Sequence, residues 1–121
     1  DRPGTGHEAI AIAWCGEGRS AWNGGGSHGV WTQPKSDPGF GHGGPPNQHP
    51  TQKPQRLMRT LIELFSNPGA TVADPFMGSG TTGVACAQLG RKFIGIEIER
   101  KYFDIACERI DNAYRQQRMF A

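Results

Sequence analysis

The feature that most constrains the fold is the stretch DPFMGSGTT at 74–82, where a turn rich in glycine and hydroxyl groups directly follows an apolar run. The run before it, ATVAD at 70–74, is typical of a short buried strand, and Thr81 or Thr82 can begin the next helix. KFIGIEI at 92–98 has the composition of a second strand. A strand, a glycine turn, a helix and a strand in this order predict one right-handed βαβ unit, and therefore an α/β fold.

Upstream of this unit lie a strand-like segment and a long segment rich in glycine and proline. In EAIAIAW at 8–14, bulky residues alternate with alanines, and this period of two predicts a strand. Residues 15–50 cannot bury a core of their own, so we expect a long loop that is ordered only by what it touches. We expect its aromatic side chains to anchor the loop to the domain rather than to stack on bases. They are Trp22, Trp31 and Phe40.

Two more helices are indicated by apolar residues at helical spacing. The first begins at about Lys53, with Pro54 in its first turn, and Asn67-Pro68-Gly69 ends it. The last begins at about Arg100 and carries aromatic, aliphatic and small residues on one face.

Composition excludes several classes of protein. A net charge of +2 with scattered basic residues is too small to indicate nucleic-acid binding by itself. Three cysteines without a CxxC pair argue against a disulfide framework or a zinc site, and they favour a reducing, cytoplasmic setting. No apolar run approaches the ~20 residues of a membrane span and no signal peptide opens the chain, so no membrane partner is expected. The histidines show no metal-ligand spacing, and we expect no metal; they are His7, His28, His42 and His49.

The glycine turn has two ligand readings. Gly78, Gly80 and Gly83 match the dinucleotide pattern G-x-G-x-x-G, and Glu97 lies about 20 residues on, where an acid can bind ribose hydroxyls. Asp74 separates the readings, because a carboxylate beside a pyrophosphate repels it. S-adenosylmethionine instead offers an ammonium and a sulfonium to that carboxylate, and a carboxylate of its own to the helix N-terminus. Charge therefore favours S-adenosylmethionine over a dinucleotide.

The motifs resemble a known family over nearly the whole chain. Residues 49–110 closely resemble the C-terminal half of DNA amino-methyltransferases, which methylate the exocyclic amine of adenine (N6) or cytosine (N4). TQKP at 51–54 is similar to their motif X, DPFMGSGTT at 74–82 to motif I, and GIEI at 95–98 to motif II. Residues 7–31 resemble their motif VIII strand and the loop after it. The order X, I, II implies a permuted Rossmann-like methyltransferase fold, of which this chain would be the cofactor-binding half.

The resemblance also implies roles for residues. Glu97 would take the ribose hydroxyls, Ile98 would lie along the adenine, and Thr51 and Lys53 would close over the cofactor. Asp74 and the glycine turn would surround the methionine part. The expected S-adenosylmethionine site comprises Thr51, Lys53, Asp74, Pro75, Phe76, Gly78, Ser79, Gly80, Thr81, Thr82, Glu97 and Ile98.

The catalytic motif of this family is absent from the 121 residues. That motif is a short Asp/Asn/Ser-Pro-Pro-Tyr/Phe/Trp segment that holds the flipped base and stacks an aromatic ring on it. Asp74-Pro75-Phe76 belongs to motif I, and asparagine follows Pro45-Pro46, so we assign no catalytic residue. We expect a cofactor half that is inactive alone and that either pairs with a missing N-terminal half or self-associates.

These expectations divide the chain into three parts. Residues 1–14 hold the strand that resembles motif VIII, 15–50 the loop, a candidate part of the target-recognition region, and 51–121 the cofactor-binding α/β part. The implied partner is double-stranded DNA with its target base flipped out. Two alternatives stay open. One is a non-catalytic cofactor-binding or interaction remnant, and the other is an NAD-dependent Rossmann oxidoreductase.

Overall fold

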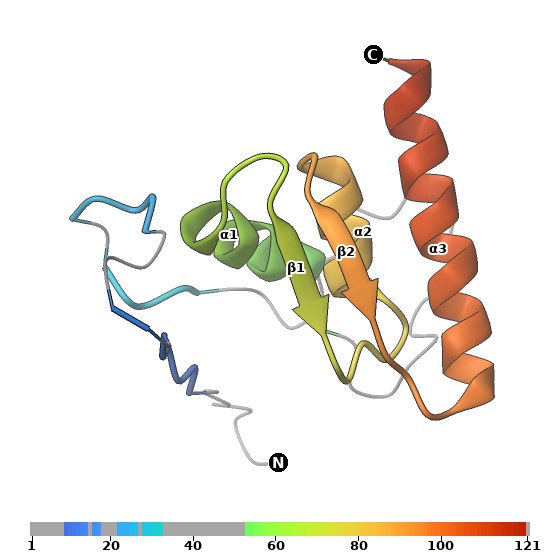
Figure 1. The fold of residues 1–121 in the computed structure, drawn as a ribbon, viewed down its shortest axis with the longest axis horizontal. Helices are drawn as coiled ribbons and strands as arrows, with labels where there is room; N and C mark the ends of the chain where they lie inside the picture. The colour runs from blue at the N-terminus through green and yellow to red at the C-terminus, as the bar shows by residue number, and fades with distance from the viewer. Residues whose placement is uncertain (1–8, 15, 18–21, 27, 33–52, 121) are drawn as a thin grey trace, which may run out of the picture.

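The computed structural model describes residues 9–14, 16–17, 22–26, 28–32 and 53–120. Regular secondary structure within these residues begins after the glycine- and proline-rich segment (Figure 1). In chain order the elements are α1 (Gln55–Phe65), β1 (Thr71–Asp74), α2 (Thr81–Gln88), β2 (Lys92–Gly95) and α3 (Arg100–Met119). No helix among the described residues is long and apolar enough to cross a membrane.

The predicted βαβ unit is present. β1 and β2 pair in parallel, from Thr71 opposite Lys92 to Asp74 opposite Gly95, and α2 connects them. β2 is shorter than the strand predicted over 92–98, and it ends at Gly95, opposite Asp74, the last residue of β1. Beyond Gly95 the chain continues beside the glycine turn, where Ile96 N donates to Asp74 O at 3.0 Å.

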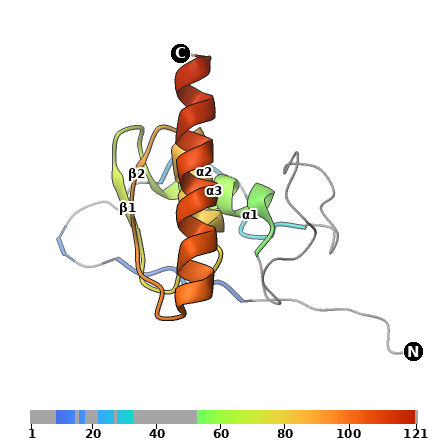
Figure 2. The same cartoon turned by 90° about the vertical axis from the view of Figure 1, so that its right-hand side faces the viewer.

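The helices lie on one side of the two-stranded sheet (Figures 1 and 2). α2 is the central helix and is buried from Thr81 to Ala87, since α1 packs on one flank and α3 on the other. The core has two clusters, one against α1 and one against α3. The first comprises Ile62, Ala85 and Cys86 with Met58, Val72, Leu89 and Phe93 around them, and the second comprises Val84, Ala87 and Ala113 with Ile110 and Tyr114.

No described residue covers the other face of the sheet. β1 was expected to be buried, but its residues alternate between exposed and half-buried. Ile94 and Ile96 are 57% and 60% exposed. A parallel sheet is normally covered on both faces, so this exposure indicates that a layer is missing from the described structure.

The boundaries of the helices follow the sequence signals. Pro54 directly precedes α1, and the helix ends before Asn67-Pro68-Gly69, where Gly69 has a φ of 81°. Gly90, with a φ of 69°, follows the end of α2. α3 begins at Arg100 as predicted.

Arg91 is buried although its sequence context suggests a solvent-exposed cation. Its Nη2 donates to Ser66 O at 2.8 Å and its Nε to Ser66 Oγ at 3.2 Å, while Nη1 donates to Leu89 O at 2.5 Å. Ser66 and Leu89 end α1 and α2. One guanidinium therefore binds the carbonyl ends of two helices, where the helix dipoles favour a positive charge.

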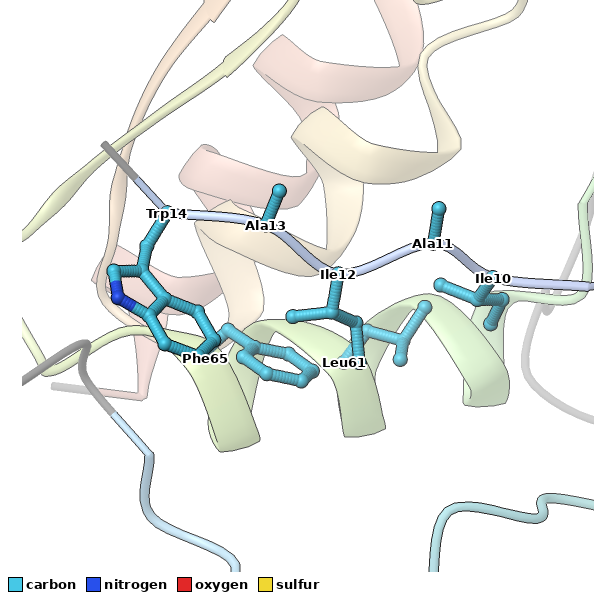
Figure 3. A pocket seen from close by; sticks show the side chains of 7 residues that line it. All are labelled: Ile10, Ala11, Ile12, Ala13, Trp14, Leu61 and Phe65. Carbon is cyan, nitrogen blue, oxygen red and sulfur yellow. The ribbon is translucent and has the colours of Figure 1, made fainter.

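The strand predicted at 8–14 is not formed over 9–14, the part that the structure describes, and this prediction was wrong. The alternation is nevertheless realised, because Ile10, Ile12 and Trp14 point toward Leu61 and Phe65 of α1 while the alanines point away (Figure 3). A strand needs a hydrogen-bonding neighbour, and within the described residues β1 pairs with β2 alone.

The loop after this segment is anchored to α1 by Trp22 and Asn23. The Trp22 and Phe65 rings have centroids 5.2 Å apart, so this aromatic residue has the predicted anchoring role. Asn23 N donates to Leu64 O at 2.8 Å, and Asn23 Nδ2 donates to Ser66 O at 3.0 Å. Phe40 and most of 15–50 lie outside the described residues.

Candidate cofactor site

The glycine loop at 75–80 lies where β1 ends and α2 begins. Gly78 and Gly80 have φ angles of 53° and 82°, a region that side chains disfavour, so the turn requires glycine at both positions. Gly80 N donates to Met77 O at 2.8 Å and closes the turn, and Met77 is buried. Ligands of open α/β sheets bind at this end of the strands, next to the helix N-terminus.

Asp74 fixes both sides of the loop. Its Oδ1 accepts a hydrogen bond from Phe76 N at 3.0 Å, and its Oδ2 accepts one from Thr82 Oγ1 at 2.6 Å. The carboxylate therefore joins the last residue of β1 to the first turn of α2. Each oxygen keeps a second lone pair, so the group can also accept from a cationic ligand.

Glu97 lies on the other side of the loop. Its Oε2 accepts from Gly78 N at 2.9 Å, and its Oε1 accepts from Glu99 N at 2.8 Å. The sequence placed Asp74 and Glu97 at the ends of two strands. The structure places both carboxylates on one glycine loop, although Glu97 follows its partner Gly78 by 19 positions in the sequence.

Ser79 is tied to α3 by a residue that sequence reasoning missed. Ser79 is only 3% exposed, and its O and Oγ accept from Arg109 Nη1 at 2.6 and 2.9 Å. Burial lowers the pKa of Arg109. One signal was available: Arg109 follows Ala106 by three residues, on the face that α3 turns to the core.

Two predicted apolar contacts stand open to solvent. Phe76 is 88% exposed and Ile98 is 94% exposed, at either side of the loop. Exposed large apolar groups next to a binding loop are typical of ligand or partner surfaces. Pro75 is exposed beside them, and Thr81 and Thr82 are buried in the first turn of α2.

The predicted contribution of motif X is described in part. Lys53 is exposed just before α1, and Thr51 lies outside the described residues. The structure thus brings together the residues from 74 to 82 and from 97 to 98, while the closing role of Thr51 and Lys53 stays a prediction.

Among the described residues, no group of three or more His, Cys, Asp or Glu is placed to hold a metal ion. Burial raises the pKa of the Cys86 thiol to about 11, so this cysteine is a core residue and no nucleophile.

The chain belongs to the DNA methylase family, whose model matches residues 15–108. Its fold is therefore an incomplete Rossmann-like methyltransferase fold. It is 48% identical over 64 residues to the Type II methyltransferase M2.DpnII of Streptococcus pneumoniae, covering 53% of this chain and 24% of that protein. The chain is also 52% identical over 65 residues to the DNA adenine methyltransferase YhdJ of Escherichia coli (strain K12). This match covers 54% of this chain and 22% of that protein.

One solved structure supports the same assignment. The crystal structure of the M1.HpyAVI–SAM complex matches with a TM-score of 0.52 and 55% identity, over 53% of this chain and 31% of that one. The matched region spans about a quarter of the length of the two curated relatives.

Proposed function

We propose that this chain is the cofactor-binding part of a DNA methyltransferase that uses S-adenosylmethionine. The observation that carries the proposal is the glycine loop held between Asp74 and Glu97, in a chain of the DNA methylase family. The M1.HpyAVI structure, similar over 53% of this chain, is a complex with SAM, which supports the same cofactor here.

The proposed contacts follow from charge and position. Asp74, at the start of the loop, faces the ammonium and sulfonium end of the cofactor, and the first turn of α2 receives its carboxylate. Glu97 accepts from the ribose hydroxyls, the exposed Ile98 lies along the adenine, and the exposed Phe76 borders the methionine part. Thr51 and Lys53 close the site from the segment before α1. S-adenosylmethionine held by these residues would supply the methyl group for transfer to an acceptor nitrogen.

The acceptor is proposed to be the exocyclic amine of a flipped base in DNA, N6 of adenine or N4 of cytosine. The name of YhdJ, a DNA adenine methyltransferase 52% identical over the matched region, favours adenine. No Pro-Pro-aromatic segment occurs in the 121 residues, so the base would be held by a segment outside them, in the same protein or in a partner chain.

A dinucleotide is disfavoured by a specific contact. In a nicotinamide-binding loop the glycine N–H groups bind pyrophosphate, whereas here Gly78 N donates to the Glu97 carboxylate. Calorimetry separates the two ligands. We expect S-adenosylhomocysteine to bind and NAD to give no measurable heat; binding of NAD alone would refute the cofactor assignment.

Methyl transfer tests the activity itself. Incubated with tritiated S-adenosylmethionine and mixed-sequence DNA, the complete protein that contains this chain is expected to label the DNA, and nucleoside analysis then identifies N6-methyladenine or N4-methylcytosine. Cofactor binding without any transfer by the complete protein would instead support the non-catalytic remnant.

A further inference from the structure

One cation connects α3 to the glycine loop. Arg109 Nη1 donates to the main-chain oxygen of Ser79 at 2.6 Å and to its hydroxyl at 2.9 Å. A peptide unit is planar, so fixing the Ser79 carbonyl also fixes the direction of the Gly80 N–H. That N–H donates to Met77 O at 2.8 Å, the bond that closes the turn. Arg109 therefore acts on the peptide that sets the shape of the loop.

The end of the loop is seated closely on α3. A methyl group added at Gly80 would lie 2.9 Å from Ala106 Cβ, and one added at Gly83 would overlap Ile110 and Phe93. These contacts leave the loop no room to approach α3 further. Close packing against α3 therefore limits how near the loop can come to that helix, and the hydrogen bonds of Arg109 keep the loop at this contact distance.

The charge of Arg109 is not balanced by an acid among the described residues. The ion pairs found there join Arg100 to Asp104 and Arg115 to Asp111, and Arg109 meets only the neutral oxygens of Ser79. In a partly buried place an unbalanced charge acts over a longer range than on the surface, because solvent screens it less. An anionic group that binds at this loop would therefore be stabilised.

We propose that Arg109 is a positioning residue for the amino-acid end of the cofactor. It holds Ser79 against α3 so that the loop keeps its binding shape, and it supplies positive charge behind the loop that favours the cofactor's carboxylate. This inference rests on the proposed function, because it concerns the same S-adenosylmethionine site.

The test compares two ligands that differ in their amino-acid part. S-adenosylhomocysteine carries the amino acid, and 5′-methylthioadenosine lacks it. In the complete protein, Arg109→Met should lower the affinity for S-adenosylhomocysteine about tenfold or more and leave that for 5′-methylthioadenosine within about twofold. Arg109→Lys, which keeps the charge and one donor group, should recover part of the loss. Arg115→Met is the matched control, since Arg115 is exposed on the same helix and pairs with Asp111.

The outcomes are distinguishable. Equal losses for both ligands, or unchanged affinity for S-adenosylhomocysteine, would overturn the positioning role. If Arg109→Met does not fold, Arg109→Lys and Ser79→Ala decide the question, and both should weaken S-adenosylhomocysteine alone. A wild-type protein that binds neither ligand would overturn the proposed function, and this inference with it.

Discussion

At the scale of single residues, Glu97 is the group on which the proposed binding of the ribose depends most. Each of its oxygens already accepts one main-chain N–H, from Gly78 and from Glu99. These bonds fix the direction of the carboxylate at the loop and leave one lone pair on each oxygen for a ligand hydroxyl. Glu97 therefore supports the loop, and its remaining lone pairs fit the ribose-binding role that we propose for it.

Glu97→Gln should therefore weaken binding of S-adenosylhomocysteine about tenfold or more, since a hydrogen bond to a charged group contributes ~1.5–3 kcal/mol. The amide has one acceptor oxygen for two N–H donors, and its NH₂ group cannot accept. Calorimetry with the 2′-deoxy analogue gives the sharper measurement, because the deoxy penalty should shrink in the mutant. Glu108→Gln, an exposed position on α3, is the control for the change in charge. Equal deoxy penalties in both proteins would exclude Glu97 as the ribose acceptor.

Residue types were predictable where chemistry required them, and long-range partners were not. Gly78 and Gly80 are required by positive φ angles, Asp74 ends β1 and Glu97 follows β2 by two residues, so a local pattern could identify all four. Arg109 and Arg91 resemble ordinary surface cations in the sequence. Their partners lie 30 and 25 residues away, at Ser79 and Ser66, and only the packing of three helices brings them together.

At the scale of elements, α1 and α2 are held together at their carboxyl ends. Arg91 donates to the oxygens of Ser66 and Leu89 that end these two helices, and Tyr114 of α3 donates to the Arg91 main-chain oxygen at 3.0 Å. The turn after α2 thus links all three helices, at the end of the sheet away from the glycine loop. Loss of the Arg91 contacts would weaken the packing of the three helices that support the glycine loop.

Arg91→Met should lower the free energy of unfolding by about 3 kcal/mol, because buried carbonyl groups lose a charged donor and gain no other. The matched change at the neighbouring exposed residue, Lys92→Met, should stay within about 0.5 kcal/mol. Urea denaturation of both variants of the complete protein measures the difference. Similar stabilities would mean that water replaces the guanidinium at these helix ends.

The element that sequence periodicity predicted wrongly shows a physical limit of such patterns. Alternation at 8–14 gave the correct two faces, since the bulky side chains face α1 (Figure 3). A period of two describes an extended backbone, but a strand also needs a neighbour with which to pair. Within the part of the chain that the structure describes, this segment has no such neighbour.

At the scale of the whole molecule, the sheet is incomplete within the described residues. β1 pairs on one side only, and the helices lie on one side of the sheet (Figures 1 and 2). The apolar side chains of Ile94 and Ile96 are exposed. Unpaired strand edges and uncovered apolar faces both favour association with another chain. We propose that a segment outside the described residues, the one expected to hold the base, completes this sheet.

Expressed as these 121 residues alone, the chain should self-associate and should transfer no methyl group to DNA. Light scattering and a tritiated-methyl transfer assay measure the two properties on the same sample. Supplying a segment that carries a strand and a Pro-Pro-aromatic motif, fused or in trans, should restore the monomer and the activity together. Ile94→Lys with Ile96→Lys is the informative control. It should reduce self-association by charging the uncovered face, yet leave S-adenosylhomocysteine affinity unchanged, because neither side chain belongs to the glycine loop. A stable monomer that methylates DNA unaided would contradict the prediction, since the acceptor site would then have to lie within these 121 residues.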